Sequence, residues 1–314
     1  MARVFIDGSA GTTGLRIRER LAARRGLEVV VLEEELRKDP AARKAAMDSS
    51  DVTFLCLPDA AAIEAADMCG NPSTVIIDTS TAHRVAPGWE YGFPELPGRR
   101  GRIAKSKRIA NPGCHASGFV ALVEPLVSAG IVPSGAILGA FSLTGYSGGG
   151  KKMIADYEEA GDELHKGGRQ YALGQSHKHL PEMKAVCGLE NAPVFCPVVV
   201  PHYSGMETTV LLPAGLAAGG LEAVRECYRS RYGGSANGVV RYVAEAPAGG
   251  FVSSAAMAGS DAMTVSAFGN DERIVLVAVF DNLGKGASGA AIQNMNIALG
   301  LPETEGLELG GAKE

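Results

Sequence analysis

Cys114 is the residue of this chain whose position most clearly predicts chemistry. It follows the Asn-Pro-Gly turn of "NPGCHASGF" (111–119) and precedes an apolar-periodic segment that predicts a helix over 115–129. The thiolate is the nucleophilic form of cysteine, and an ordinary thiol with a pKa of about 8.5 is only slightly ionised at neutral pH. The unpaired amides and the positive dipole end of this helix would favour the thiolate and could hold an oxyanion formed on a carbonyl.

A cysteine nucleophile usually works with an imidazole. His177 and His179 flank Lys178 in "SHKHLPEM", and His202 ends the apolar run "VVVPHY". His177 and His202 both remain candidates for the acid/base. The pair at i and i+2 could also bind a metal, but no third ligand has a suggestive spacing, so we predict no metal site. The other cysteines, which lack the CxxC spacing of zinc or redox sites, are predicted to be buried thiols: Cys56, Cys69, Cys187, Cys196 and Cys227.

A second chemical signal is the glycine-rich stretch "GSAGTTG", with Gly8, Gly11 and Gly14 between a predicted strand and a predicted helix. A pyrophosphate needs a tight turn, a bare backbone and a helix N-terminus, which these glycines can supply in order. The spacing departs from G-x-G-x-x-G, so an ordinary turn is the alternative. An acidic residue in the following "EEELRKD" would favour NAD, whereas Arg37 and Lys38 favour the 2′-phosphate of NADP, which we predict.

The elements that must position these residues fall into two groups. Apolar strands alternate with helices in the first third of the chain, which predicts a parallel sheet covered on both faces and a Rossmann-type dinucleotide-binding domain. The predicted strands are 2–7, 27–32, 51–58, 73–80 and 108–112, and the predicted helices are 15–24 and 59–70.

The later part of the chain is richer in strand signals, including a hairpin at "GNDE" (269–272). The segment 115–129 reads as a helix with one buried face, and 286–300 as a small-residue helix that returns to the first domain. We therefore expect an α/β protein with 1–114 and 285–314 as the dinucleotide domain. Residues 115–284 would form an α+β substrate and dimerisation domain with a mostly antiparallel or mixed sheet.

Composition limits the partners. The chain has 314 residues and a formal net charge of −5, which disfavours nucleic acid and anionic membranes as partners. Neither an 18-residue apolar stretch nor a signal-peptide pattern is found, so we expect a soluble cytoplasmic protein.

Several motifs together resemble the N-acetyl-gamma-glutamyl-phosphate reductases of arginine biosynthesis, in their short form, within the group of semialdehyde dehydrogenases. They are "GSAGTTGLRIRERL", "LRKD", "FLCLPDAAAIEA", "DTSTAHRVAPGWEYGFPEL", "NPGCHASGF", "TGYSGGGKKM", "HKHLPEM" and "DNLGKGASGAAIQNMN", and they span nearly the whole chain. The resemblance implies the matching fold and NADPH-dependent reductive dephosphorylation of an acyl phosphate.

The resemblance also implies site residues. The nucleophile falls on Cys114, and the acid/base on His177, six residues after Tyr171, with His202 as second choice by analogy to aspartate-semialdehyde dehydrogenases. The implied cofactor contacts are Gly8, Ser9, Gly11, Thr12, Thr13, Gly14, Arg37, Lys38, Gly286 and Asn294. Because the substrate is a small anion that releases inorganic phosphate, nearby cations are expected: Arg84, Arg108, Lys151 and Lys152.

The implied reaction proceeds through a thioester on Cys114, which accepts a hydride, while a protonated histidine supplies a proton as the thiohemiacetal collapses. The second domain suggests a homodimer or homotetramer. Rival interpretations are a dehydrogenase of the aspartate-semialdehyde or aminoadipate-semialdehyde type, and a non-catalytic NADP-binding protein in which the cysteine is incidental.

Overall fold

The computed structural model describes residues 1–159, 162–234 and 238–310. Internal contacts divide the chain into two compact units: unit 1 contains Met1–Gly113 and Ala287–Leu307, and unit 2 contains Cys114–Gly286 and the residues from Glu308 onward. The expected boundaries differ from this division by one or two residues at 114 and 285. They differ further at 308–310, because Glu308 exchanges hydrogen bonds with Asp261 of unit 2.

Unit 1 is built on a six-stranded sheet in the order β2-β1-β3-β4-β6-β5, with every pair of strands parallel. The strands are β1 (Ala2–Asp7), β2 (Leu27–Val30), β3 (Val52–Leu55), β4 (Val75–Asp78), β5 (Glu90–Tyr91) and β6 (Arg108–Ala110). The five expected strands are present, and the two-residue β5 adds an edge that the sequence does not predict. All carboxyl ends lie at one edge of this sheet, the edge at which open α/β sheets bind ligands.

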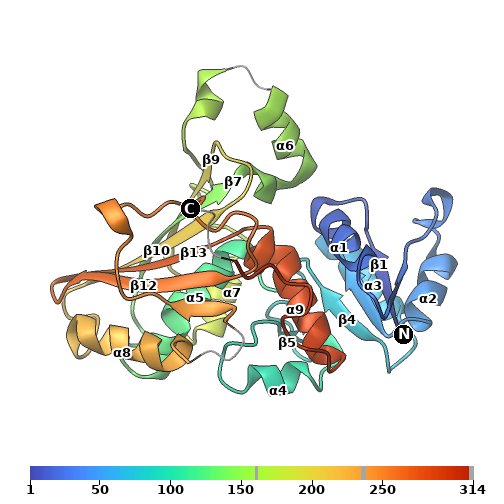
Figure 1. Cartoon of the computed structure of the whole chain (residues 1–314), viewed down its shortest axis with the longest axis horizontal. Helices are drawn as coiled ribbons and strands as arrows, with labels where there is room; N and C mark the ends of the chain where they lie inside the picture. Colours follow the sequence, from blue (N-terminus) through green and yellow to red (C-terminus); the bar gives the residue numbers. More distant parts are fainter. Residues whose placement is uncertain (160–161, 235–237, 311–314) are drawn as a thin grey trace. The chain divides into compact units, whose positions relative to one another are not determined.

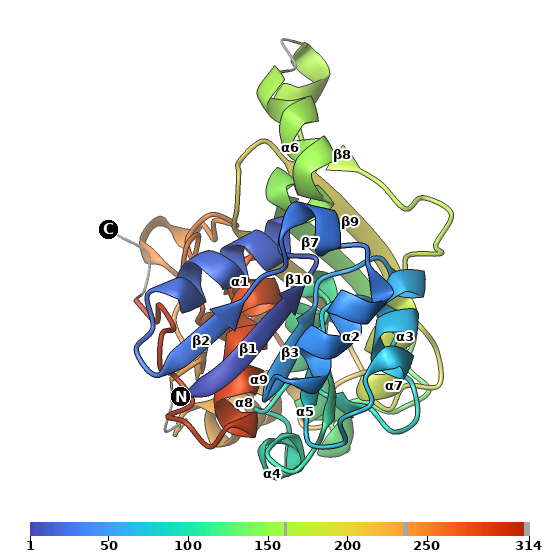
Figure 2. The same cartoon turned by 90° about the vertical axis from the view of Figure 1, so that its right-hand side faces the viewer.

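Helices cover both faces of this sheet, as the continuous apolar strands predict. The helices of unit 1 are α1 (Thr12–Ala22), α2 (Pro40–Asp48), α3 (Asp59–Met68), α4 (Arg99–Ile103) and α9 (Gly289–Ala298), with a short 3₁₀ turn at Glu34–Leu36. Alternate strand residues divide between two cores: Val4 and Ile6 pack with α1 and α9, whereas Phe5 packs with α2 and α3. Figure 2 shows α1 and α2 on either side of β1 to β3.

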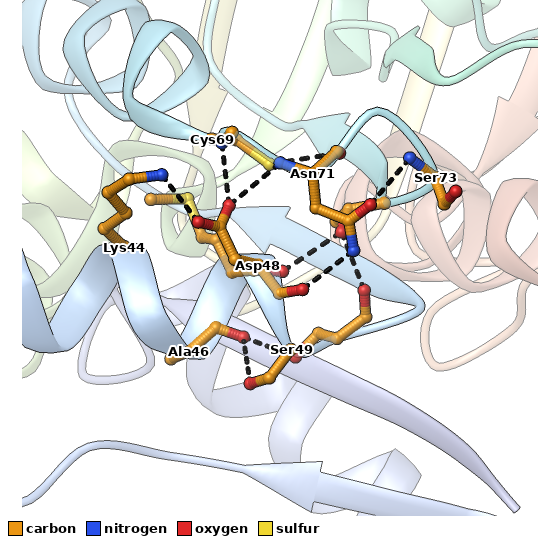
Figure 3. Close-up of polar contacts among 11 residues, drawn as sticks. Lys44, Ala46, Asp48, Ser49, Cys69, Asn71 and Ser73 are labelled. Carbon is orange, nitrogen blue, oxygen red and sulfur yellow. Dashed lines mark hydrogen bonds and ion pairs between the residues drawn. The ribbon is translucent and has the colours of Figure 1, made fainter.

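Polar side chains join two segments at the amino edge of the same sheet (Figure 3). Asp48, the last residue of α2, accepts hydrogen bonds from the amides of Gly70 and Asn71 at 2.7 and 3.0 Å and from Lys44. The Lys44 hydrogen bond is the main cause that lowers the pKa of Asp48. Asn71 returns a bond to the Asp48 carbonyl and accepts one from the Ser73 amide. These hydrogen bonds therefore connect the end of α2 to the loop before β4 and have a structural role.

Unit 2 contains a seven-stranded mixed sheet in the order β11-β12-β13-β10-β7-β9-β8. The strands are β7 (Gly139–Gly145), β8 (Arg169–Gln170), β9 (Val194–Val200), β10 (Met206–Pro213), β11 (Val240–Tyr242), β12 (Met263–Asn270) and β13 (Arg273–Phe280). β7 pairs with β9 and β11 with β12 in parallel, and the other pairs are antiparallel. The hairpin predicted at 269–272 joins β12 to β13, so the expectation of a mixed sheet is confirmed.

The helices of unit 2 are α5 (Cys114–Ser128), α6 (Gly150–Glu159), α7 (Leu180–Val186) and α8 (Gly220–Tyr232). Figure 1 shows α6 extending away from the sheet. The expectation of one buried face on α5 is wrong, since nearly all its residues from His115 to Leu126 are buried. α5 packs against β10 and β13 as well as α7 and α8, so it is a central helix of unit 2.

Candidate active site

Cys114 is the first residue of α5 and is partly exposed, as a nucleophile must be. The first turn of α5, residues 114–117, contains no acidic side chain, so the helix dipole and the first amides favour an anion there. Gly118 sets how closely α5 approaches the sheet. A Cβ at Gly118 would overlap the hydroxyl of Thr208 on β10 and lie 2.8 Å from Phe280 on β13.

Gly286 packs directly on Cys114. A Cβ added to Gly286 would lie 3.0 Å from the Cβ of Cys114 and 3.0 Å from the carbonyl oxygen of Asp281. Gly286 belongs to a π-helical turn, Gly284–Ser288, in which the amides of Gly284 and Gly286 both donate to Asp281. Such turns are frequent at functional sites. Gly286 was predicted as a cofactor contact, and the structure gives it close packing on Cys114.

Aromatic and imidazole rings of unit 2 gather around His115, the neighbour of Cys114. The His115 ring centroid lies 5.4 Å from that of His177 and 5.7 Å from that of His179. The Tyr171 hydroxyl lies 2.7 Å from Nε2 of His115. We call these four residues the histidine cluster. Burial raises the pKa of Tyr171, and the nearby Cys114 raises it further. Because His115 directly follows Cys114 in α5, the cluster lies close to the cysteine.

The imidazoles of the histidine cluster differ in what they can do. Burial, together with the nearby His177, lowers the pKa of His115 to about 3, so this ring is neutral near physiological pH. His177 is only partly buried. Its Nδ1 accepts a hydrogen bond from the His179 amide at 3.1 Å, so the neutral His177 ring carries its proton on Nε2. His177 is therefore the accessible imidazole of the cluster, with Nε2 as the donor.

His202, the second predicted acid/base, has different neighbours. Its Nε2 is 2.9 Å from the Ser254 hydroxyl, and its backbone carbonyl accepts from the amide of Tyr146. Burial lowers the pKa of His202, and the charge of Asp281 partly opposes this. The structure thus places His177 in the cluster around His115, the neighbour of Cys114, and gives His202 a separate set of contacts.

The glycine loop of unit 1 lies at the carboxyl edge of its sheet, between β1 and α1. Gly8 has φ +85°, and a Cβ on it would overlap the Cys56 carbonyl. A Cβ on Gly14 would lie 2.5 Å from the Gly8 carbonyl oxygen. The chain itself therefore requires Gly8 and Gly14. Gly11 is different, since a Cβ there would make only ordinary contacts, at 3.6 Å from the Gly8 carbonyl oxygen, and the local fold does not itself require this glycine.

The remaining predicted cofactor residues of unit 1 have these positions. Ser9 is buried in the loop, and Thr12 and Thr13 begin α1. Arg37 donates to the Leu32 carbonyl at 3.4 Å, and Lys38 is exposed beside it.

Asn294 of α9 is fully buried in unit 1. Its Nδ2 donates to the Gly92 carbonyl at 2.9 Å and to Oδ1 of Asn111 at 3.2 Å. Its Oδ1 has no hydrogen-bond partner within the described ranges. A buried acceptor without a donor is costly unless a ligand or water supplies one.

Comparisons with known proteins identify the family of this chain. A model of the semialdehyde dehydrogenase dimerisation domain matches residues 114–282. The chain is 42% identical over 306 residues to N-acetyl-gamma-glutamyl-phosphate reductase of Burkholderia ambifaria, covering 95% of this chain and 96% of that protein. It is 45% identical over 305 residues to the Rhizobium meliloti protein of the same name, covering 95% and 98%. The chain belongs to the N-acetyl-gamma-glutamyl-phosphate reductase family.

Solved structures confirm the fold of this reductase family member. Aspartate semialdehyde dehydrogenase II from Vibrio cholerae, complexed with ASA, superposes with a TM-score of 0.70 at 18% identity, covering 95% of this chain and 98% of that one. Aspartate semialdehyde dehydrogenase with NADP from Candida albicans gives 0.64 at 14% identity, with 95% and 99% covered. The family resemblance and the fold class expected from the sequence are both confirmed.

The predicted substrate cations of this reductase family member separate into two groups. Arg84 donates to the carbonyls of Asn111 and Thr79, which follow β6 and β4 at the carboxyl edge. Arg108 is the first residue of β6 and donates to the Thr74 carbonyl at the amino edge. This position disfavours Arg108 as a substrate ligand, because ligands bind at the carboxyl edge. The exposed Lys151 and Lys152 lie in the first turn of α6.

From the sequence, Tyr171 was only a landmark, His115 had no role, and His179 was considered only as a metal ligand beside His177. The adjacency of His115 to Cys114 was the available signal, whereas the contact of His115 with Tyr171 spans 56 positions.

Within the described ranges, no group of three or more His, Cys, Asp or Glu side chains is arranged to hold a metal ion. None of the helices described is long and apolar enough to cross a membrane.

Proposed function

We propose that this chain reduces N-acetyl-gamma-glutamyl phosphate to the corresponding semialdehyde with NADPH, releasing inorganic phosphate. The observation that carries the proposal is the combination of family membership over 95% of the chain with a partly exposed cysteine at the head of a buried helix. The relatives carry the reductase name, and Cys114 supplies the nucleophile that the reaction requires.

Cys114 and His177 carry the proposed chemistry. The Cys114 sulfur attacks the acyl carbon, the bond from that carbon to phosphate breaks, and a thioester remains. When bound, NADPH supplies the hydride that reduces this thioester. The Nε2 proton of His177 stabilises the negative charge on the carbonyl oxygen, and collapse of the thiohemiacetal returns the electron pair to sulfur. The aldehyde leaves and the thiolate is regenerated.

The residues of unit 1 fit a dinucleotide. Gly11, the residue before α1, presents no side chain where backbone amides and the helix dipole favour a pyrophosphate. Arg37 and Lys38 follow β2, where they suit a 2′-phosphate and support NADP over NAD. The buried Oδ1 of Asn294 can accept a hydrogen bond from a carboxamide such as that of nicotinamide.

An anionic substrate needs cations, and we propose Arg84, Lys151 and Lys152 for this role. Arg84 supports it by its place at the carboxyl edge of the sheet of unit 1. The two lysines are exposed at the start of α6, which directly follows a glycine-rich turn. The guanidinium of Arg84 would suit a carboxylate, and the lysines a phosphate.

We also propose a cytoplasmic homo-oligomer. Phe141, Val194 and Leu211 are 45%, 52% and 41% exposed and lie on neighbouring strands of the unit 2 sheet. Such an apolar sheet face suits a second copy of the chain. No disulfide joins the six cysteines, all of which lie in the described ranges, and this suits a reducing compartment.

A reverse assay tests the proposed function. The purified protein is given phosphate and NADP with N-acetyl-glutamate semialdehyde, aspartate semialdehyde or aminoadipate semialdehyde in turn. We expect kcat/KM for the N-acetylated aldehyde to exceed the others by at least about a hundredfold, and NADP to be used better than NAD. Equal or better use of aspartate semialdehyde would favour the rival dehydrogenase. Binding of NADP without any turnover would favour the non-catalytic alternative.

A further inference from the structure

A chain of buried polar side chains leads to the neighbourhood of Cys114. Thr208 of β10 and Ser142 of β7 have their hydroxyl oxygens 3.1 Å apart. The Ser142 hydroxyl lies 2.8 Å from Nδ1 of His115, and Nε2 of His115 lies 2.7 Å from the hydroxyl of Tyr171. Thr208 and Ser142 are at most 1% exposed, and His115 is 2% exposed. Side chains from β10, β7 and α5 are therefore linked by hydrogen bonds to the hydroxyl of Tyr171, which follows β8.

The protonation states of His115 and Tyr171 allow all these hydrogen bonds to run in the same donor-to-acceptor direction, toward the Tyr171 oxygen. His115 is neutral, so one ring nitrogen donates and the other accepts. Burial and the neighbouring Cys114 raise the pKa of Tyr171, which therefore keeps its proton. If Ser142 donates to Nδ1, then Nε2–H donates to the Tyr171 oxygen. The phenolic hydrogen of Tyr171 is then available to an anion.

We propose that His115 is a positioning residue that, with Ser142 and Thr208, aims the Tyr171 hydroxyl as a hydrogen-bond donor at the Cys114 sulfur and then at the oxyanion of its acyl adduct. Only the second contact rests on the proposed function. Each bond in the chain polarises the next, which strengthens the last donor without placing a charge in the core. In the proposed arrangement Tyr171 is the group that meets the reacting atoms, and His115 acts only through Tyr171.

The test measures the ionisation of Cys114 without any substrate. The rate of alkylation of Cys114 by iodoacetamide is followed by mass spectrometry of its peptide from about pH 5 to pH 10. The proteins compared are the wild type, Tyr171→Phe, His115→Phe, the double variant and His115→Gln. Gln retains an N–H that can donate to Tyr171, and Phe does not.

We expect Tyr171→Phe and His115→Phe each to move the midpoint of the alkylation profile upward by about one pH unit. The double variant should move it no further than Tyr171→Phe alone, and His115→Gln should stay close to the wild type. In turnover, the two Phe variants should lower kcat by about tenfold to a hundredfold with little change in KM.

Two results would overturn the inference. One is an unchanged alkylation profile in His115→Phe, and the other is a full additional shift when His115→Phe is combined with Tyr171→Phe. If His115→Phe does not fold, Ser142→Ala replaces it. Ser142→Ala must move the midpoint of the alkylation profile upward by a smaller amount, and this shift must disappear when Tyr171→Phe is also present. The thiol readout needs no acyl phosphate, so failure of the proposed reaction is recognised separately by the aldehyde assay.

Discussion

Cys56 and Cys114 are both partly exposed and both follow a strand of the parallel sheet in sequence, yet different groups surround them. Desolvation raises the pKa of the Cys56 thiol to about 12, and the charges of Asp78 and Asp7 add to this effect. Cys114 instead begins a helix, and the residue that follows it, His115, belongs to the histidine cluster. The first environment opposes an anion, and the second offers hydrogen-bond donors to one.

The difference shows that reactivity depends on the groups that meet the sulfur. A thiol with a pKa of 12 is ionised to only about one part in ten thousand at pH 8. A strand-to-loop position is therefore insufficient for a nucleophile, whereas the head of a helix with donors nearby favours one.

The largest expected difference between the two sites is in kcat, when each cysteine is replaced in turn. Cys114→Ser should lower kcat by at least about a thousandfold while NADP binding is retained, because the weaker nucleophile cannot form the thioester. Cys56→Ser should change kcat by less than about twofold. Steady-state kinetics and cofactor titration on both variants measure this, and equal losses would remove the distinction between the two sites.

Gly286 offers a second test of the comparison, because it packs on Cys114 without a side chain of its own. Gly286→Ala places a Cβ 3.0 Å from that of Cys114 and should displace it, lowering kcat about tenfold. The matched control is Gly101→Ala in α4, where a new Cβ meets nothing within 4 Å. If both variants have wild-type turnover, close packing on the cysteine is unimportant.

The neutral His115 predicts a smaller effect on stability. Its pKa is about 3 when folded, against about 6.5 when unfolded, so below pH 6.5 only the unfolded state gains this proton. The stability that depends on the neutral ring is thus present above pH 6.5 and lost as the pH falls toward 3. His115→Gln should make the free energy of unfolding less dependent on pH in this window, by at most ~1.4 kcal/mol per pH unit. Urea unfolding at several pH values measures the slope, and identical slopes in the two proteins would mean that folding does not lower the pKa of His115.

Much of the fold is predictable from the sequence because its signals are local. Strands such as 2–7 and the 269–272 hairpin follow from short apolar runs and turn residues, and the structure has both. The burial of α5 on nearly all sides was not predictable, since it depends on which helices of the folded chain surround it. The position of Arg108 at the amino edge follows from its place as the first residue of a predicted strand, so the sequence alone already disfavours it as a substrate ligand.

The candidate site follows the same division. Cys114 and the glycine loop are local patterns and could be located by their turn residues and the helix that follows. The contacts of His115 with Ser142 and Tyr171 join residues 27 and 56 positions apart, which periodicity does not encode. For the same reason, His177 and His202 could be ranked by resemblance but not by their surroundings.

Selective alkylation tests the central claim most directly. The wild-type protein is treated with limiting iodoacetamide near pH 7, and the modification of each cysteine is compared with the remaining aldehyde-forming activity. We expect Cys114 to be alkylated at least about a hundredfold faster than Cys56 and activity to fall in proportion to Cys114 modification. Full activity after complete modification of Cys114 would contradict the assignment of the nucleophile.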